Sequence, residues 1–150
     1  MTQTSSQVSG CDTTVELDDE NGILQDVTGS SSGVDQEFIQ NVGDGLRTFG
    51  TDFKVRAACG RDGTVTWRAV YSQADNESLY MLNDWYFNHP KTARTFRVSI
   101  PDKLPGSDQY TFEMLLASLR IPDESGNPDP ILVEASLIPT GTFDWSVIAS

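Results

Sequence analysis

The stretch from residue 63 to residue 100 constrains this chain most, because its pattern changes from that of a strand to that of a helix and back. Residues 63–72 and 96–100 alternate apolar and polar side chains, as half-buried strands do. Between them lies the one segment with a convincing helical pattern. A single helix in a chain that otherwise has strand character is expected to cover an open face or end of a β-sheet.

The predicted helix spans about residues 75–88. Ser72 and Asp75 are both candidate N-caps. The helix should end before Pro90, because the residue before a proline avoids helical backbone angles. Four side chains recur at helical spacing and are expected to pack against the core: Leu79, Leu82, Trp85 and Tyr86.

The rest of the chain predicts a mainly β domain. Asp62-Gly63 predicts a tight hairpin turn, because such turns need positive φ angles. A second turn is expected at residues 139–141, and a bulge near residues 115–117, where the alternation breaks. With one packed helix, roughly eight or nine strands would form a β-sandwich or barrel. The expected strands are 13–17, 23–28, 34–42, 53–59, 63–72, 96–100, 109–121, 131–138 and 142–148.

The chain has 150 residues, enough for one domain with a sizeable core. Residues 1–11 are rich in Thr, Ser, Gln and Gly and predict a flexible N-terminal arm before a single domain over residues 12–150. We find neither the segments of a signal peptide nor an apolar run long enough for a membrane helix. Cys11 and Cys59 are therefore expected to be reduced thiols, with a disulfide as the minor alternative.

Charge is distributed unevenly along the sequence. Residues 1–46 carry nine acids and no Lys or Arg, residues 47–120 carry all ten bases and eight acids, and residues 121–150 carry five acids and no base. The net charge of −12 argues against a nucleic-acid binder, which should show a basic stripe. Two interpretations stay open: the acids keep the protein soluble, or they line a surface that repels a negatively charged molecule.

The residues that catalysis needs are scarce. The one histidine, His89, is placed to end the predicted helix, and two distant cysteines cannot complete a zinc site of ordinary spacing. We find no glycine-rich phosphate loop and no nucleophile elbow. We therefore expect no enzyme activity, no metal and no cofactor. A glycosidase-like carboxylate pair stays open, and so does a carbohydrate-binding platform that uses Trp67, Trp85 or Trp145.

Residues 43–53 combine glycines with two large apolar side chains, Leu46 and Phe49. Apolar residues on a loop often dock on another molecule. The alternative is a loop that folds back on its own core. The sequence leaves both possibilities open.

The order of several short segments resembles that of the tail tube (major tail) proteins of long-tailed bacteriophages. The similarity covers most of residues 20–145 and consists of loosely matched segments rather than one sharp motif. These segments are 23–29, 48–50, 62–67, 93–98, 110–113 and 139–143.

This resemblance implies a β-sandwich with a flanking helix that assembles into six-membered rings, and rings that stack into a hollow tube. The chain would be a structural virion protein of the tail, assembled in the host cytoplasm. Its partners would be itself, the tape measure, tail terminator and distal tail proteins, and duplex DNA that passes without specific binding. The long loop would contact the next ring through Leu46, Arg47, Phe49 and Phe53.

Acids on the early strands are expected to line such a lumen, because carboxylates repel phosphates. The residues assigned to this role are Glu16, Asp26, Asp35 and Glu37. Two alternatives to a tube subunit remain. One is another tail component of the same fold, such as a tube-end or neck protein, and the other is a monomeric carbohydrate-binding β-sandwich.

Overall fold

The computed structural model describes residues 13–47, 50, 53–54, 56–122 and 129–149, and the fold is mainly β, as predicted. Within these residues, seven strands form one antiparallel sheet in the order β2-β1-β5-β6-β7-β4-β3. No helix in this part of the chain is long and apolar enough to cross a membrane. The elements are β1 (Thr14–Asp18), β2 (Leu24–Asp26), η2 (Thr28–Ser30), β3 (Ser31–Val42), β4 (Ala58–Val70), α1 (Ser78–Asn83), η3 (Asp84–Asn88), β5 (Arg94–Ile100), β6 (Asp108–Arg120) and β7 (Leu132–Val147).

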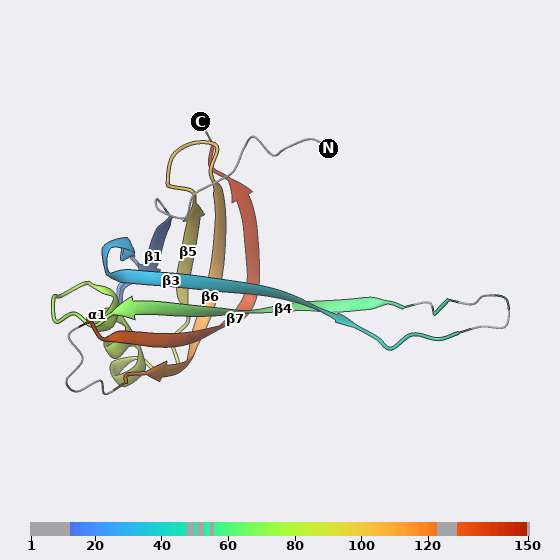
Figure 1. Ribbon diagram of the computed structural model, residues 1–150, viewed down its shortest axis with the longest axis horizontal. Coiled ribbons are helices and arrows are strands. Elements are labelled where there is room, and N and C mark those ends of the chain that lie inside the picture. The colour runs from blue at the N-terminus through green and yellow to red at the C-terminus, as the bar shows by residue number, and fades with distance from the viewer. Residues whose placement is uncertain (1–12, 48–49, 51–52, 55, 123–128, 150) are drawn as a thin grey trace.

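The sheet curls on itself, so that its two halves form crossed layers (Figure 1). β1, β5 and β6 lie in one layer, and β3 and β4 lie in the other. β7 joins the layers, because it pairs with β4 at residues 132–137 and with β6 at residues 134–147. A register shift between Leu116 and Ser118 in the β6–β7 ladder confirms the predicted bulge, a feature that bends a strand.

The predicted hairpin turn at residues 61–63 is wrong. These residues lie inside β4 and pair with β3, and the chain reverses instead between Val42 and Ala58. Gly63 provides space rather than a turn, because a Cβ atom on it would lie 2.9 Å from the carbonyl oxygen of Glu37 on the neighbouring strand. The sequence alone does not distinguish a glycine that forms a turn from a glycine that makes room for a neighbouring strand.

The predicted turn at residues 139–141 is also wrong, because these residues form a bend within the single strand β7. Pro139 stays in the ladder opposite Met114, and Gly141 takes a φ of +95°, which glycine adopts at little cost. Two pairs of expected strands therefore merge into β4 and β7. This accounts for seven observed strands where nine segments were expected.

The core lies between the crossed layers. Trp67 of β4 packs against Phe96 of β5, with ring centroids 5.5 Å apart. Phe38 of β3 packs on Phe112 and Phe143, with its ring centroid 5.8 Å from each. Trp67, Phe96 and Phe112 are buried, whereas Phe38 remains 52 % exposed and covers the edge of this cluster. Burial of the first three is a main source of stability for the two layers.

The helix begins later than predicted, at Ser78, and α1 continues directly into the π-helical turn η3. Neither Ser72 nor Asp75 caps it, and Glu77 at the N-cap position makes no side-chain cap bond within the described structure. The backbone N–H of Ser78 instead donates to the hydroxyl oxygen of Ser30, 3.0 Å away and 48 residues earlier in the chain. A cap from so distant a residue leaves no local signal in the sequence.

The helix packs one face on the sheet and ends at Asn88, before Pro90, as expected. Of the four side chains predicted to pack on the core, the structure buries Leu79, Leu82 and Trp85. Tyr86 is 46 % exposed, so its predicted core contact is wrong. The π-helical turn holds more residues per turn than an α-helix, which rotates Tyr86 away from the core.

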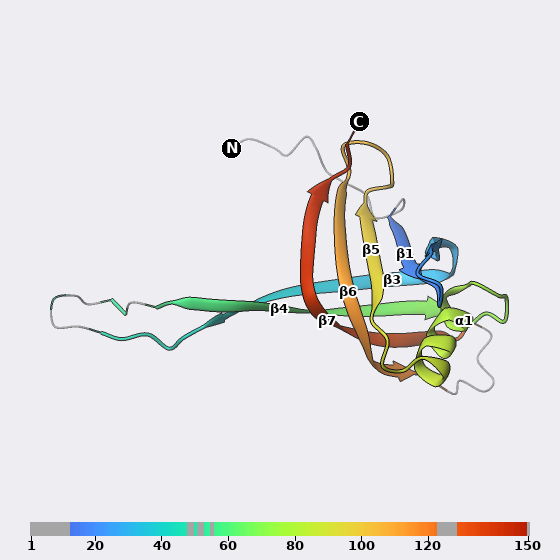
Figure 2. The same ribbon diagram turned by 180° about the vertical axis from the view of Figure 1, so that it is seen from behind.

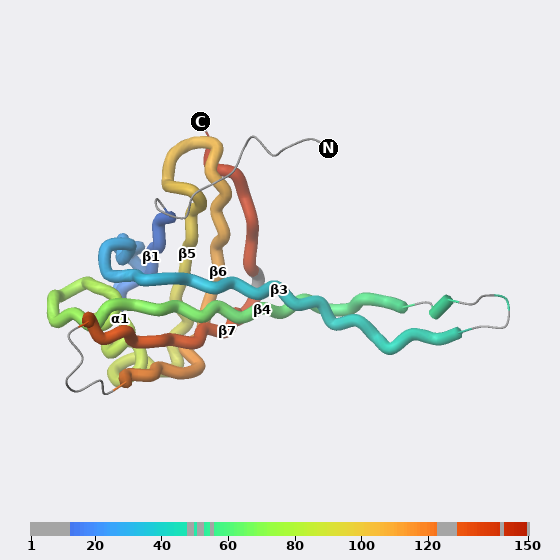
Figure 3. The backbone as a smooth tube through the Cα atoms, in the orientation of Figure 1, coloured from blue at the N-terminus to red at the C-terminus, as the bar shows by residue number. Residues whose placement is uncertain are grey.

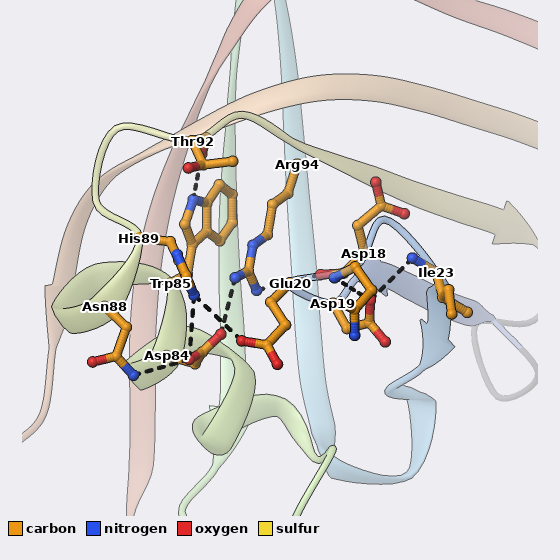
Figure 4. A network of polar contacts seen from close by, with 11 residues as sticks. Asp18, Asp19, Glu20, Ile23, Asp84, Trp85, Asn88, His89, Thr92 and Arg94 are labelled. Atoms are coloured by element: carbon orange, nitrogen blue, oxygen red, sulfur yellow. Dashed lines mark hydrogen bonds and ion pairs between the residues drawn. The ribbon is translucent and has the colours of Figure 1, made fainter.

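A buried arginine fastens the helix to the sheet (Figure 4). Arg94 of β5 contacts the carboxylate of Asp84 at 3.0 Å and lies over the ring of Trp85, 5.5 Å from its centroid. It also donates a hydrogen bond to the carbonyl oxygen of Asp18 on β1, at 3.4 Å. Asp84 accepts a further hydrogen bond from Asn88 at 2.9 Å. One guanidinium therefore holds η3, β5 and the end of β1 together.

Leu82→Asp places a carboxylate in a fully buried apolar site. We expect it to lower the free energy of unfolding by roughly 3 kcal/mol or more, because the charge loses its water and gains no partner. Tyr86→Asp is the matched control, since it puts the same charge on the exposed side of the same helix. Urea unfolding measures the free energy of unfolding of both variants. A Leu82→Asp protein as stable as the wild type would mean that the buried helix face is assigned incorrectly.

The Asp84–Arg94 ion pair predicts how stability depends on pH. The hydrogen bond from Asn88 and the contact with Arg94 lower the pKa of Asp84 below its ordinary value of 3.8. The stabilisation is present above that ordinary value and is lost as the pH falls through the lower pKa of the folded state. We expect Asp84→Asn to unfold at a lower urea concentration than the wild type at neutral pH, and the two midpoints to converge in strong acid. A difference between the two urea midpoints that stays constant in acid would contradict this dependence of stability on the ionisation of Asp84.

Candidate assembly surfaces

The outer parts of β3 and β4 extend beyond the rest of the molecule as a two-stranded hairpin arm, residues 39–61 (Figures 1 and 3). Gln40 pairs with Arg61 in this arm, and Val42 pairs with Ala58. Beyond them, the N–H of Gly43 donates to the carbonyl oxygen of Ala57 at 3.0 Å. These backbone bonds keep the described part of the arm extended.

The described part of the hairpin arm presents apolar and basic side chains to solvent. Leu46 is 71 % exposed and Phe53 is 80 % exposed. Arg47, expected with them to contact the next ring, is also exposed, whereas Phe49 lies outside the described residues. The alternative of a loop folded back on its own core does not hold for Leu46 or Phe53.

β3 forms one edge of the sheet, and among the described residues it pairs with β4 on one side only. It is 12 residues long, whereas β2 at the other edge has 3 residues. A long open edge presents a row of backbone N–H and C=O groups that can pair with another chain. β3 is therefore a candidate surface for strand pairing between copies.

The four acids expected in a lumen do not lie together. Glu16 and Asp26 are cross-strand partners on β1 and β2, whereas Asp35 and Glu37 lie on β3. The assignment of Glu16 is wrong, because this residue is 4 % exposed and its carboxylate contacts the Nζ atom of Lys103 at 3.0 Å. A buried and ion-paired carboxylate cannot present its charge to a channel.

Asp35 and Glu37 share the outer face of the β3–β4 layer, on the side away from the core. The Nη1 atom of Arg68 lies 2.7 Å from the carboxylate of Asp35, and this hydrogen bond and positive charge lower the pKa of Asp35. Strand register places Glu134 and Arg120 on the same face. Register also places Asp62 on this face, where it pairs with Ile39, so the face carries both acids and arginines.

A second polar cluster surrounds His89 at the end of the helix (Figure 4). The Nε2 atom of His89 lies 3.3 Å from Glu20 and 3.9 Å from Asp84, and one ligand-type atom from each of the three lies within 4.8 Å of the others. Arg94 already binds Asp84, and its positive charge disfavours a metal cation at the same carboxylate. The lowered pKa of Asp84 also makes it unsuited to the general-acid role of a glycosidase, which needs a raised pKa.

The tryptophans considered as a carbohydrate platform do not lie on one surface. Trp67 and Trp85 have no exposed surface, and their ring N–H groups donate to the Ser31 hydroxyl and the Thr92 carbonyl. Trp145 is 64 % exposed. Of the three, Trp145 alone could contact a sugar, so the structure does not favour the carbohydrate-binding alternative.

Two residues that position the helical end differ in how much sequence signal they carry. Arg94 lies on the same strand face as Phe96 and Val98. The alternation of side chains along the sequence therefore predicts that Arg94 faces the core. Ser30 lies in a glycine- and serine-rich stretch that has the composition of a loop. Its hydroxyl contacts that of Ser78, 48 residues later in the chain, and no local sequence pattern indicates such a contact.

No protein-family model matches the chain, and no curated protein does. Solved structures do match. A chain from the tail of an empty gene transfer agent particle, refined with C6 symmetry, gives a TM-score of 0.70 at 14 % identity, over 94 % of this chain and 99 % of that one. The SPP1 tail tube gives 0.70 at 9 % identity, over 96 % and 81 %. A sheath–tube complex of an extracellular contractile injection system gives 0.65 at 14 % identity, over 96 % and 94 %. This chain therefore has the fold of phage-type tail tube proteins.

Proposed function

We propose that this chain is a structural, non-catalytic subunit of a phage-type tail tube built from stacked six-membered rings. The observation that carries the proposal is a long open sheet edge next to an apolar and basic hairpin arm, on a fold shared with tube proteins. An isolated subunit leaves both surfaces uncovered. Repeated contacts between copies would cover them.

Ring closure would use the sheet edges. β3 of one copy would pair with an edge of its neighbour, so that the layers join into one continuous barrel and no copy keeps an open edge. The C6 symmetry used for the gene transfer agent tail supports six copies per ring.

Stacking of rings would use the hairpin arm. The arm projects away from the crossed layers, so it can reach a copy that lies beyond the ring of its own subunit (Figure 3). It would contact a different surface on that copy, and head-to-tail contacts of this kind build an open filament rather than a closed oligomer.

The outer face of the β3–β4 layer would line the lumen. Arg68 offsets the charge of Asp35, so Glu37 and Glu134 are the acids that would face DNA most directly. Carboxylates repel phosphates, so duplex DNA would pass without specific binding.

The tube would end on other tail proteins, namely the tape measure, tail terminator and distal tail proteins, in a virion tail assembled in the host cytoplasm. A second candidate function is a tube-end or baseplate component. A chain of the anti-feeding prophage baseplate supports it, with a TM-score of 0.67 at 12 % identity over 98 % of both chains. Such a component would form a single ring rather than a growing tube.

Negative-stain electron microscopy of the purified protein, with size-exclusion chromatography beside it, tests the proposal. Hollow tubes with a pore wide enough for duplex DNA would support a tube subunit. Isolated rings would support a tube-end component. A protein that stays monomeric at every concentration and binds a glycan would contradict both.

Leu46→Asp adds a carboxylate to the apolar surface of the hairpin arm, where little packing within the subunit is lost. We expect rings to form but tubes to be roughly tenfold shorter or absent, because every subunit of a ring would bury an unpaired carboxylate in the contact with the next ring. Leu104→Asp, at an exposed leucine in the loop between β5 and β6, is the matched control. Electron microscopy measures tube length. Tubes of wild-type length from Leu46→Asp would exclude this residue from the contact between rings.

Glu37→Lys tests the assignment of the lumen, because it would place one added cation per subunit along the path of DNA. We expect tubes of this variant to retain labelled duplex DNA and to release it as salt rises, since the attraction is electrostatic. Glu37→Gln, which removes the charge without reversing it, is the control. If Glu37→Lys tubes retain no more DNA than wild-type tubes, Glu37 does not face the lumen.

A further inference from the structure

The hairpin arm and the helix lie at opposite ends of the longest axis of the molecule, as both views show (Figures 1 and 2). We call the helical end the helical pole, which comprises α1, η3, the turn between β1 and β2 and the loop before α1. A head-to-tail stack along this axis brings the hairpin arm of one copy to the helical pole of the next.

The helical pole exposes aromatic side chains. Tyr80 is 47 % exposed and Phe87 is 70 % exposed. Both line a shallow groove together with Asn83 and Asn88. Tyr86 lies beside Phe87 in an edge-to-face contact, with ring centroids 5.0 Å apart. Clustered exposed aromatics of this kind are typical of a surface that contacts another protein.

Acids surround these aromatics. A second groove runs between the β1–β2 turn and α1, lined by Asp19, Glu20 and Asp84, with Tyr80 as part of its wall. Tyr80 therefore belongs to both grooves, which makes the apolar and acidic parts of the pole one continuous surface.

The charge balance at this pole is negative. Asp75 and Glu77 add two further carboxylates in the loop that leads into α1. The basic residues nearby are Arg94, which is buried against Asp84, and the exposed Lys91. The helical pole is thus an aromatic face with an acidic rim.

The hairpin arm has the opposite character. Residues 39–61 carry four bases and two acids, a net charge of +2, whereas the rest of the chain carries six bases and 20 acids, a net charge of −14. Three of the bases, Arg47, Lys54 and Arg56, lie close in sequence to the exposed Leu46 and Phe53. The described residues of the arm thus combine exposed apolar side chains with more bases than acids.

We propose that the hairpin arm of one copy docks on the helical pole of the next copy in the stack, an inference that rests on the proposed tube function. Leu46 and Phe53 would cover Tyr80 and Phe87, while the bases of the arm face the acids of the pole. Guanidinium groups suit such a surface, because they bind carboxylates and also stack on aromatic rings. The complementary charges would also fix the direction of the stack.

Charge reversal on each side tests this contact. Arg47→Glu with Lys54→Glu makes the arm acidic, and Asp75→Lys with Glu77→Lys makes the pole basic. Each double variant sets like charges against each other, so we expect the protein concentration needed for stacking to rise about tenfold or more. The quadruple variant restores opposite charges and is expected to recover stacking.

The control is Glu113→Lys with Asp144→Lys, which changes the net charge by the same amount as the pole variant on the outer faces of β6 and β7. Circular dichroism checks that every variant folds. Stacking is measured as tube length by electron microscopy. If the subunit needs an initiator to form tubes, sedimentation velocity at low and high salt measures self-association of the same variants instead.

Loss of stacking in both double variants and recovery in the quadruple variant would support the contact. Stacking of either double variant at the wild-type concentration would overturn it, and so would a quadruple variant as defective as the two double variants. In those cases the tube function would stand and the helical pole would face another protein. If the wild-type protein forms no rings or tubes and does not self-associate, this result would contradict the proposed function and also the proposed contact.

Discussion

The open edge of β3 is the constraint on which the rest of the structure depends. A sheet that closed on itself would pair the backbone groups of every strand, but this sheet ends on a strand of 12 residues that the described chain pairs on one side. The backbone groups of such an edge favour pairing with another strand, because an exposed long edge otherwise invites uncontrolled association. In the proposed tube, pairing with other copies would cover this edge and the arm that extends from it.

The body of the molecule supports the edge strand β3 through a shared core. The crossed layers share one core, in which Trp67 of one layer packs on Phe96 of the other. The bends in β6 and β7 bring those layers together, and Arg94 fixes the helix across their end. Because these parts are packed and hydrogen-bonded, little conformational entropy is left to lose when copies associate. A rigid body of this kind suits a subunit that must repeat the same contact many times.

The spacing of apolar side chains predicted the elements that depend on residues close together in the sequence. The spacing around Leu82 predicted the helix, although the π-helical turn moved Tyr86 outwards. The same spacing could not predict contacts between residues far apart in the sequence. Ser30 caps the helix from another part of the chain, and Gly63 makes room for a neighbouring strand. The same limit explains the lumen acids, because nothing near Glu16 in sequence shows that Lys103 will cover it. For the candidate site, the sequence predicted that the loop at residues 43–53 projects. It did not predict that the paired strands β3 and β4 extend outwards to support this loop.

Hydrogen exchange along β3, compared between the free subunit and the assembled protein, tests the central claim most directly. Amides on the unpaired side of β3 should exchange rapidly in the free subunit and slowly after assembly, because strand pairing between copies would protect them. Amides of β5, which pairs on both sides within one chain, should stay protected in both states. Equal exchange along β3 in the free and assembled protein would contradict the claim that this edge joins the copies.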